Sequence, residues 1–285
     1  MPLSRAVRAV PFLALSLLFG VRAVPLWAES RPAPPVFTPT YADLADLADN
    51  APLVMRAKIR KVAEIKTPRS TGATTGLARV YIEAVTENLF TGPAAVGESL
   101  RYLADIRRDA KGKLPKLTKQ SVLLFARHVP GHPGELQLIA PDAQIPATPA
   151  SEEVLRSILT ELFAPGAPPR VTGVHEAIFV AGNLVGEGES QIFLTTANEE
   201  PAAITVRHQT GQLPKWSASF SEVVDSGGLP PRRDSLPWYR LACFLPAQLP
   251  AGVNVSAGTG DRSQAEADYR LVMADLGPCP RNRGS

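Results

Sequence analysis

The histidines are the first candidates for chemistry, and none stands in a pattern that metal binding or catalysis requires. Those in question are His128, His132, His175 and His208. His128 and His132 have the spacing of two zinc ligands on one helix face, but Val-Pro-Gly between them forbids that helix. His175 precedes Glu176 in a predicted strand, where neighbouring side chains point to opposite faces. His208 ends a strand at a turn. We therefore predict solvated histidines, with no metal and no cofactor.

Other possible catalytic or metal-binding patterns are incomplete. The stretch Gly186-Glu-Gly-Glu-Ser190 lacks the Gly-x-Ser-x-Gly frame of a nucleophile elbow, so we interpret it as a loop. Asp43, Asp46 and Asp49 lie three residues apart on a predicted helix and lack the calcium-loop pattern. No Gly-rich phosphate loop, paired-cysteine metal site or His-Glu-x-x-His motif occurs in the sequence. The sequence predicts a protein that is not an enzyme, although a triad assembled from distant residues is invisible at this level.

One segment stands above this background: the chain reads Arg107-Arg-Asp-Ala-Lys-Gly-Lys-Leu-Pro-Lys-Leu-Thr-Lys119 between two predicted strands. Its cations are Arg107, Arg108, Lys111, Lys113, Lys116 and Lys119. A protruding loop of this kind is predicted to contact anionic lipid head groups or lipopolysaccharide. The alternative is a solvated loop that keeps the sheet from aggregating. No aromatic residue is interleaved with the cations, so single-stranded nucleic acid is not an expected partner.

The first 28 residues have the pattern of a secretory signal peptide. Arg5 and Arg8 precede an apolar run over residues 9–20, and small-residue cleavage options follow at Ala23 and at Ala28, of which we favour Ala28. Arg22 interrupts the apolar run, so an uncleaved membrane anchor is the less favoured alternative. Because the leader carries three arginines and no acid, its removal reduces the formal charge from +3 to zero. We expect a periplasmic or secreted protein without a nucleic-acid partner.

The two cysteines, Cys243 and Cys279, both remain after the predicted cleavage. An even pair in an exported chain predicts one disulfide bond. The alternative is a pair of buried free thiols. A catalytic cysteine is disfavoured because no histidine lies nearby in the sequence, and because oxidation to a disulfide would leave no thiolate to act as a nucleophile.

Strands dominate the first half after an extended segment at 29–39 and a short helix that begins at Thr40 with a capping-box pattern. In Leu53 to Val62, apolar residues alternate with basic ones, as in a half-buried strand with a basic outer face. Further strands are expected at residues 79–89, 100–106, 122–126 and 136–139. Pairing of the first two strands would place Arg56, Lys58 and Arg60 opposite Glu83 and Glu87.

A resemblance to a known family rests on a short helix followed by four segments: APLVMRAKIRKV, RVYIEAVTENLFTG, GESLRYLADI and SVLLFAR. Residues 40–149 resemble the five-stranded oligonucleotide/oligosaccharide-binding (OB) barrel of netrin-like modules, the family that includes tissue inhibitors of metalloproteinases. Inhibition in that family depends on an N-terminal cysteine and several disulfides, and this region has no cysteine, so the activity does not transfer. The chain as a whole resembles exported proteins of alphaproteobacteria that carry no known activity.

The second half begins after a helix capped by Ser151 and a linker within 150–169. Residues 170–280 are predicted to hold an antiparallel meander and two helices, at 236–244 and at 263–276, before a tail at 281–285. Ser263 and Glu266 form a capping-box pattern at the second helix. The sequence thus predicts an α+β fold, mostly antiparallel β, in which an OB-like barrel is followed by this second domain.

These features favour a non-enzymatic binding or structural protein of the bacterial cell envelope. One alternative is an envelope hydrolase with its active site at the junction of the two halves. Another is a protease-inhibitor-like module, by analogy with the netrin-like fold.

Overall fold

A computed structural model describes residues 37–65, 76–221 and 228–283. The predicted signal peptide and nearly all of the extended segment lie outside these residues. Within them, no helix is both long enough and apolar enough to span a membrane.

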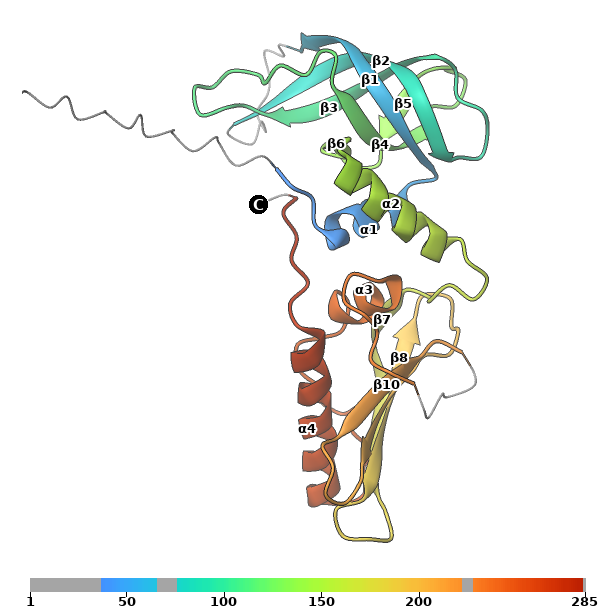
Figure 1. Ribbon diagram of the computed structural model, residues 1–285, viewed down its shortest axis with the longest axis vertical. Coiled ribbons are helices and arrows are strands. Elements are labelled where there is room, and N and C mark those ends of the chain that lie inside the picture. The colour runs from blue at the N-terminus through green and yellow to red at the C-terminus, as the bar shows by residue number, and fades with distance from the viewer. Residues whose placement is uncertain (1–36, 66–75, 222–227, 284–285) are drawn as a thin grey trace, which may run out of the picture. The chain divides into compact units, whose positions relative to one another are not determined.

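The first sheet contains six strands in the order β3-β2-β1-β4-β5, with β6 paired to β4, and every pairing is antiparallel (Figure 1). Its strands are β1 (Leu53–Glu64), β2 (Leu77–Thr91), β3 (Ser99–Arg107), β4 (Ser121–His128), β5 (Leu136–Leu138) and β6 (Gln144–Pro146). The five strands predicted here are confirmed as strands. β6 is not among the strands expected from the sequence.

The ends of this sheet approach each other without forming a ladder. A single parallel bridge joins Arg101 of β3 to Glu135 next to β5. Further along, the Asp105 amide donates to the Pro141 carbonyl at 2.8 Å. The sheet is therefore not a closed barrel.

The core of this half lies around β4 and helix α1 (Tyr41–Asn50). Residues 122–126 of β4 are at most 2% exposed, as the continuous apolar run predicts for a central strand. Thr40 caps α1 with the predicted capping box, in which its hydroxyl accepts from the Asp43 amide and the Asp43 carboxylate accepts from the Thr40 amide. Leu44 and Leu47 of α1 are buried.

The second sheet is the predicted antiparallel meander, in the order β10-β9-β8-β7. Its strands are β7 (Val171–Ala181), β8 (Gly188–Thr196), β9 (Ala203–His208) and β10 (Lys215–Ser219). β8 begins at Gly188 and Ser190 is fully buried within it, so the interpretation of residues 186–190 as a loop is wrong for its last three residues. The sequence predicts a strand from Trp216 to Val224, but β10 ends at Ser219, and residues 222–224 lie outside the described part.

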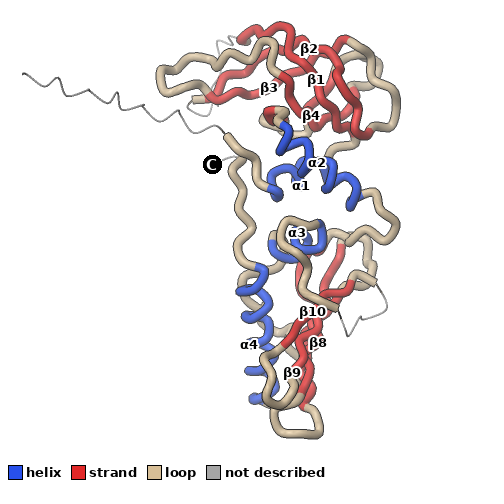
Figure 2. The backbone as a smooth tube through the Cα atoms, viewed as in Figure 1, coloured by secondary structure: helices blue, strands red, loops and turns tan. Residues whose placement is uncertain are grey.

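Three further helices complete the fold: α2 (Pro149–Leu162), α3 (Leu236–Ala242) and α4 (Thr259–Leu276), which runs alongside the second sheet (Figure 2). Two predicted caps are wrong by one turn. The N-cap of α2 is Thr148, with Ser151 as its capping-box partner. α4 begins after Gly258, so Ser263 lies inside the helix, where its hydroxyl donates to the Thr259 carbonyl.

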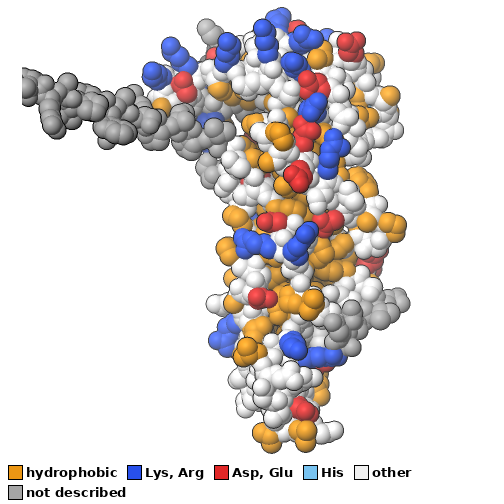
Figure 3. All heavy atoms as spheres, in the orientation of Figure 1, with side chains coloured by type: hydrophobic (Ala, Val, Ile, Leu, Met, Phe, Trp, Pro, Cys, Tyr) orange, Lys and Arg blue, Asp and Glu red, His pale blue; other side chains and the backbone are white. Residues whose placement is uncertain are grey.

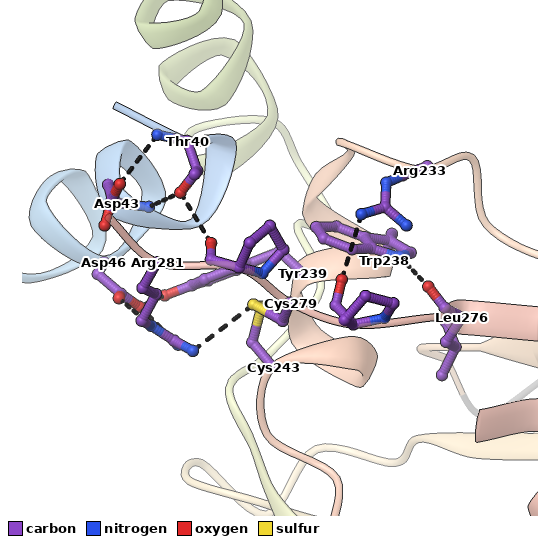
Figure 4. The surroundings of a disulfide bond; sticks show 12 residues. Thr40, Asp43, Asp46, Arg233, Trp238, Tyr239, Cys243, Leu276, Cys279 and Arg281 are labelled. Carbon is purple, nitrogen blue, oxygen red and sulfur yellow. Dashed lines mark hydrogen bonds and ion pairs between the residues drawn. A yellow bond between two sulfur atoms is a disulfide. The ribbon is translucent and has the colours of Figure 1, made fainter. Parts of the chain in front are cut away.

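The predicted disulfide is present. Cys243 at the end of α3 is bonded to Cys279 just beyond α4, with their Cα atoms 5.2 Å apart (Figure 4). Because disulfides persist in oxidising compartments, this bond indicates a location outside the cytoplasm.

Each of the three aspartates of α1 binds residues of the second half. Asp43 is buried and accepts from the amides of Asn282 and Arg283. Asp46 accepts from the Tyr239 hydroxyl at 2.6 Å and from Arg281 (Figure 4). The division into domains at residues 164–169 stays a prediction, but α1, α2 and α3 contact one another.

The third aspartate, Asp49, forms the most buried ion pair of the group. Arg240 donates to both carboxylate oxygens, at 2.7 and 3.0 Å, and its side chain is only 4% exposed. Arg170 contacts the same carboxylate at 2.6 Å. Asp49 therefore joins α1 to α3 and to the start of β7.

Candidate functional site

The basic loop follows β3, and hydrogen bonds to its one acidic residue, Asp109, hold its turn. Asp109 accepts from the amides of Lys111 and Lys113 through one carboxylate oxygen, each at 2.8 Å. Gly112, with φ +72°, makes the turn between them. Leu114 and Leu117 pack against the core. The loop is thus held down by its apolar residues while its lysines are exposed.

The far end of the loop lies along β1. The Lys119 amide donates to the Ile59 carbonyl at 2.8 Å, and the Ile59 amide donates to the Gln120 carbonyl at 2.9 Å. Lys119 therefore sits beside the segment that carries Lys58 and Arg60. A register shift in the pairing of β1 with β2 leaves Arg60 without a partner residue across the strands, and its side chain is exposed.

We call the six cations on these two adjoining segments the cationic strip: Lys58, Arg60, Lys111, Lys113, Lys116 and Lys119. Among the described residues, none of the six forms an ion pair. Figure 3 shows Lys and Arg side chains gathered over the first sheet, along the upper edge of the view.

The two arginines at the start of the loop differ from its lysines. Arg108 is paired with Glu64 and also donates to the Gly112 carbonyl, so it holds the loop against the end of β1. Arg107 is exposed at the end of β3. We therefore separate both arginines from the cationic strip.

The other basic residues of β1 are neutralised. Arg56 lies between Glu87 and Glu152, at 3.0 and 2.8 Å, which confirms one of the predicted cross-strand pairs. Glu83 pairs with Lys61 and not, as the sequence predicts, with Arg56, Lys58 or Arg60. Both glutamates beside Arg56 raise the pKa of its guanidinium, through hydrogen bonding to Glu152 above all.

The histidines are placed differently from the prediction in two cases. His208 is largely buried, with Nε2 at 2.9 and 3.0 Å from the two carboxylate oxygens of Asp268. Nε2 of His128 is also buried. The prediction of solvated rings is therefore wrong for His208 and His128, because strand pairing and helix packing cover positions that look terminal in the sequence. His132 and His175 are exposed.

The surroundings of His208 hold a serine, a histidine and a carboxylate, but in the wrong order for nucleophilic catalysis. The buried Ser190 hydroxyl donates to Asp268 at 2.6 Å, and Gln264 donates to the same carboxylate at 2.9 Å. Asp268 is thus the central group, and the histidine does not accept the serine proton as a triad requires. The cluster attaches α4 to β8 and β9.

This arrangement predicts a structural role with a measurable cost. Asp268→Asn is expected to lower the free energy of unfolding by about 1–3 kcal/mol, because it removes a charged acceptor that serves one buried and two half-buried side chains. Ser190→Ala should cost about 1 kcal/mol. Urea denaturation measures both values, and Ser263→Ala, an exposed position on the same helix, is the matched control. An unchanged midpoint for Asp268→Asn would contradict the buried network.

The surface grooves among the described residues include two of similar size. The larger, of about 600 Å³, lies where β3 and β5 diverge and is flanked by the Arg79–Asp105 ion pair. The other, of about 570 Å³, contains His175, Glu199, Glu200 and Ser221. These are residue types that a hydrolase uses, yet within the described residues no hydrogen bond joins His175 to a carboxylate.

Neither the buried tyrosines nor a metal-binding cluster provides a further candidate site among the described residues. Burial raises the pKa of the Tyr239 phenol, and the hydrogen bond to Asp46 raises it further, so this group stays protonated. In the described ranges, no cluster of three histidine, cysteine or acidic side chains is arranged to hold a metal ion.

Sequence reasoning found the basic loop but missed the contribution of β1. The missing signal was the pairing of β1 with β4, which brings residues 58–60 beside residue 119. A scan against protein-family models found no family that matches the chain, and a search of curated proteins found no relative.

Proposed function

We propose that this is a non-enzymatic, exported protein of the bacterial cell envelope that binds a phosphate-bearing anionic surface through the cationic strip. The observation that carries the proposal is that two segments distant in the sequence adjoin at Ile59 and Lys119 and together carry six cations that form no ion pair among the described residues. A cation near an anionic lipid surface contributes about 1 kcal/mol, and salt weakens this attraction. Anionic phospholipid and lipopolysaccharide share the phosphate chemistry that would be recognised.

We also propose that the first sheet is an incompletely closed OB-like barrel. Its order β3-β2-β1-β4-β5, with a parallel contact between β3 and β5, is the order that an incompletely closed OB-like barrel would have. In this view α1 and α2 cover one end of the barrel, and the cationic strip lies on its outer surface. The order of the strands supports this assignment.

Vesicle binding tests the function. We expect the leader-free protein, verified by N-terminal sequencing, to sediment with phosphatidylglycerol vesicles at low salt. Changing Lys111, Lys113, Lys116 and Lys119 to Ser should weaken binding at least about tenfold, because four of the six cations of the strip are lost. The matched control replaces Arg127, Lys215, Arg232 and Arg270 with Ser, which removes the same charge from other exposed positions.

The outcomes separate the possible sources of the ligand. Binding to lipopolysaccharide but not to phosphatidylglycerol assigns the strip to the outer membrane surface, and the reverse assigns it to phospholipid. Equal weakening by the loop variant and by the control variant would contradict a localised site, because net charge alone would then explain binding.

The two alternatives remain predictions. For a hydrolase, the groove around His175 holds suitable residue types, but no hydrogen bond among the described residues joins His175 to a carboxylate. For a protease inhibitor, the first sheet lacks the cysteines on which inhibition in the netrin-like family depends. We therefore argue only the binding function.

A further inference from the structure

The second sheet ends in exposed aliphatic side chains, which we call the apolar tip: Leu184 and Val185 in the β7–β8 turn and Leu213 in the β9–β10 turn. They are 63%, 96% and 86% exposed. In Figure 1 the turn after β7 extends past the end of α4, and Figure 3 shows hydrophobic atoms at the lower end of the view. Turns usually carry polar residues, so three large aliphatic side chains here are unexpected.

The two turns are fixed to each other. The Thr210 hydroxyl donates to the Val185 carbonyl at 2.8 Å. The β7–β8 turn is closed by the hydrogen bond from the Gly182 amide to the Glu187 carbonyl, also at 2.8 Å. Gly186 has φ +85°, a backbone conformation that residues other than glycine rarely adopt. The apolar tip is thus presented on a preorganised scaffold, which lowers the entropic cost of binding.

The charges near the apolar tip balance. Arg207 pairs with Glu189 at 2.7 Å. The exposed Lys215 and the half-buried Glu187 add one charge of each sign. The surroundings therefore provide no net attraction for an ion, unlike the cationic strip on the first sheet.

We propose that the apolar tip inserts into the hydrocarbon region of a lipid bilayer. Side chains at the ends of two hairpins project outward, and a bilayer can receive such a projection without a complementary pocket. The set is purely aliphatic, and its surroundings are neutral, so the recognised medium is hydrocarbon and not a head-group charge. This site is independent of the cationic strip, because it requires neither anionic lipid nor low salt.

Tryptophan fluorescence tests the insertion. Val185→Trp places a reporter at the most exposed position, whereas the native Trp216 and Trp238 are buried. With vesicles of uncharged phosphatidylcholine, its emission is expected to shift to shorter wavelength and to be quenched by bromine-labelled acyl chains. Leu229→Trp, at another exposed leucine, is the matched control and should show neither change.

A second variant measures the contribution to binding. Changing Leu184, Val185 and Leu213 to Ser should lower the partition coefficient into phosphatidylcholine about 100-fold or more, with no dependence on salt. The fold should be unchanged by circular dichroism because all three positions are exposed. The variant with four lysines replaced in the basic loop should partition like the wild type, so failure of this proposal and of the proposed function can be told apart.

Two results would overturn the insertion. One is an unshifted Val185→Trp emission in the presence of vesicles. The other is a wild-type protein that dimerises in solution through these residues, with the serine variant monomeric and lipid without effect. That result would assign the apolar tip to a second copy of the chain.

Discussion

Replacing Asp49 with alanine is expected to lower the free energy of unfolding by about 3–5 kcal/mol, because it leaves a buried arginine without its counter-ion. Arg240 donates to both oxygens of Asp49, and its Nε donates to the Pro168 carbonyl at 3.1 Å. With the side chain 4% exposed, water cannot replace the lost carboxylate. Guanidinium chloride denaturation with linear extrapolation measures the change.

Arg170→Ala is the matched control for this variant. Arg170 contacts the same carboxylate, but its side chain is 42% exposed, so its loss should cost about 1 kcal/mol or less. The double variant Asp49→Leu with Arg240→Met should be more stable than Asp49→Ala, because neither charge then remains buried. A loss below about 1 kcal/mol for Asp49→Ala would contradict the buried contact between α1 and α3.

Removal of the disulfide has the second large expected effect. Cys243→Ala with Cys279→Ala should lower the free energy of unfolding by about 3–4 kcal/mol, since the bond closes a loop between residues separated by 36 positions. The chain-entropy model attributes this loss to greater freedom of the unfolded state. Thermal and denaturant unfolding with and without a reductant measure it.

The same change should act on the tail beyond Cys279. Asn282 and Arg283 donate their amides to Asp43, and Arg281 pairs with Asp46 (Figure 4). Without the disulfide, we expect faster hydrogen exchange at these two amides than in the wild type. A reductant should have no further effect on the double alanine variant. The stabilising role of the disulfide would be contradicted if the reduced wild type, with two free thiols detected by mass spectrometry, kept the unfolding midpoint of the oxidised protein.

Local patterns in the sequence predicted the first helix and strands β1 to β5 correctly. Alternation in Leu53 to Val62 and the continuous apolar run at residues 122–126 depend only on which face each side chain occupies. Thr40 and Asp43 form their cap within four residues. Such signals do not require knowledge of distant contacts.

Non-local pairing explains what the sequence did not reveal. The aspartates of α1 look like a solvated face until the C-terminal tail and α3 are placed against them. His208 looks solvated until α4 brings Asp268 to it. The contribution of Lys58 and Arg60 to the candidate site likewise depends on the pairing of β1 with β4.

Two features of the surface suggest different kinds of lipid contact. The cationic strip would respond to head-group charge, and the apolar tip would respond to hydrocarbon. Salt weakens the first and leaves the second unchanged, so one salt series on charged and uncharged vesicles separates their contributions.

The most direct test of the central claim is the dissociation constant for phosphatidylglycerol vesicles, measured across a salt series for the wild type and for the variant with the four loop lysines replaced. We expect strong wild-type binding at low salt that weakens as salt rises, and a variant that binds at least about tenfold more weakly with a shallower dependence on salt. Identical curves for the two proteins, or no binding by either to phosphatidylglycerol and lipopolysaccharide, would contradict the assignment of the cationic strip as the functional surface.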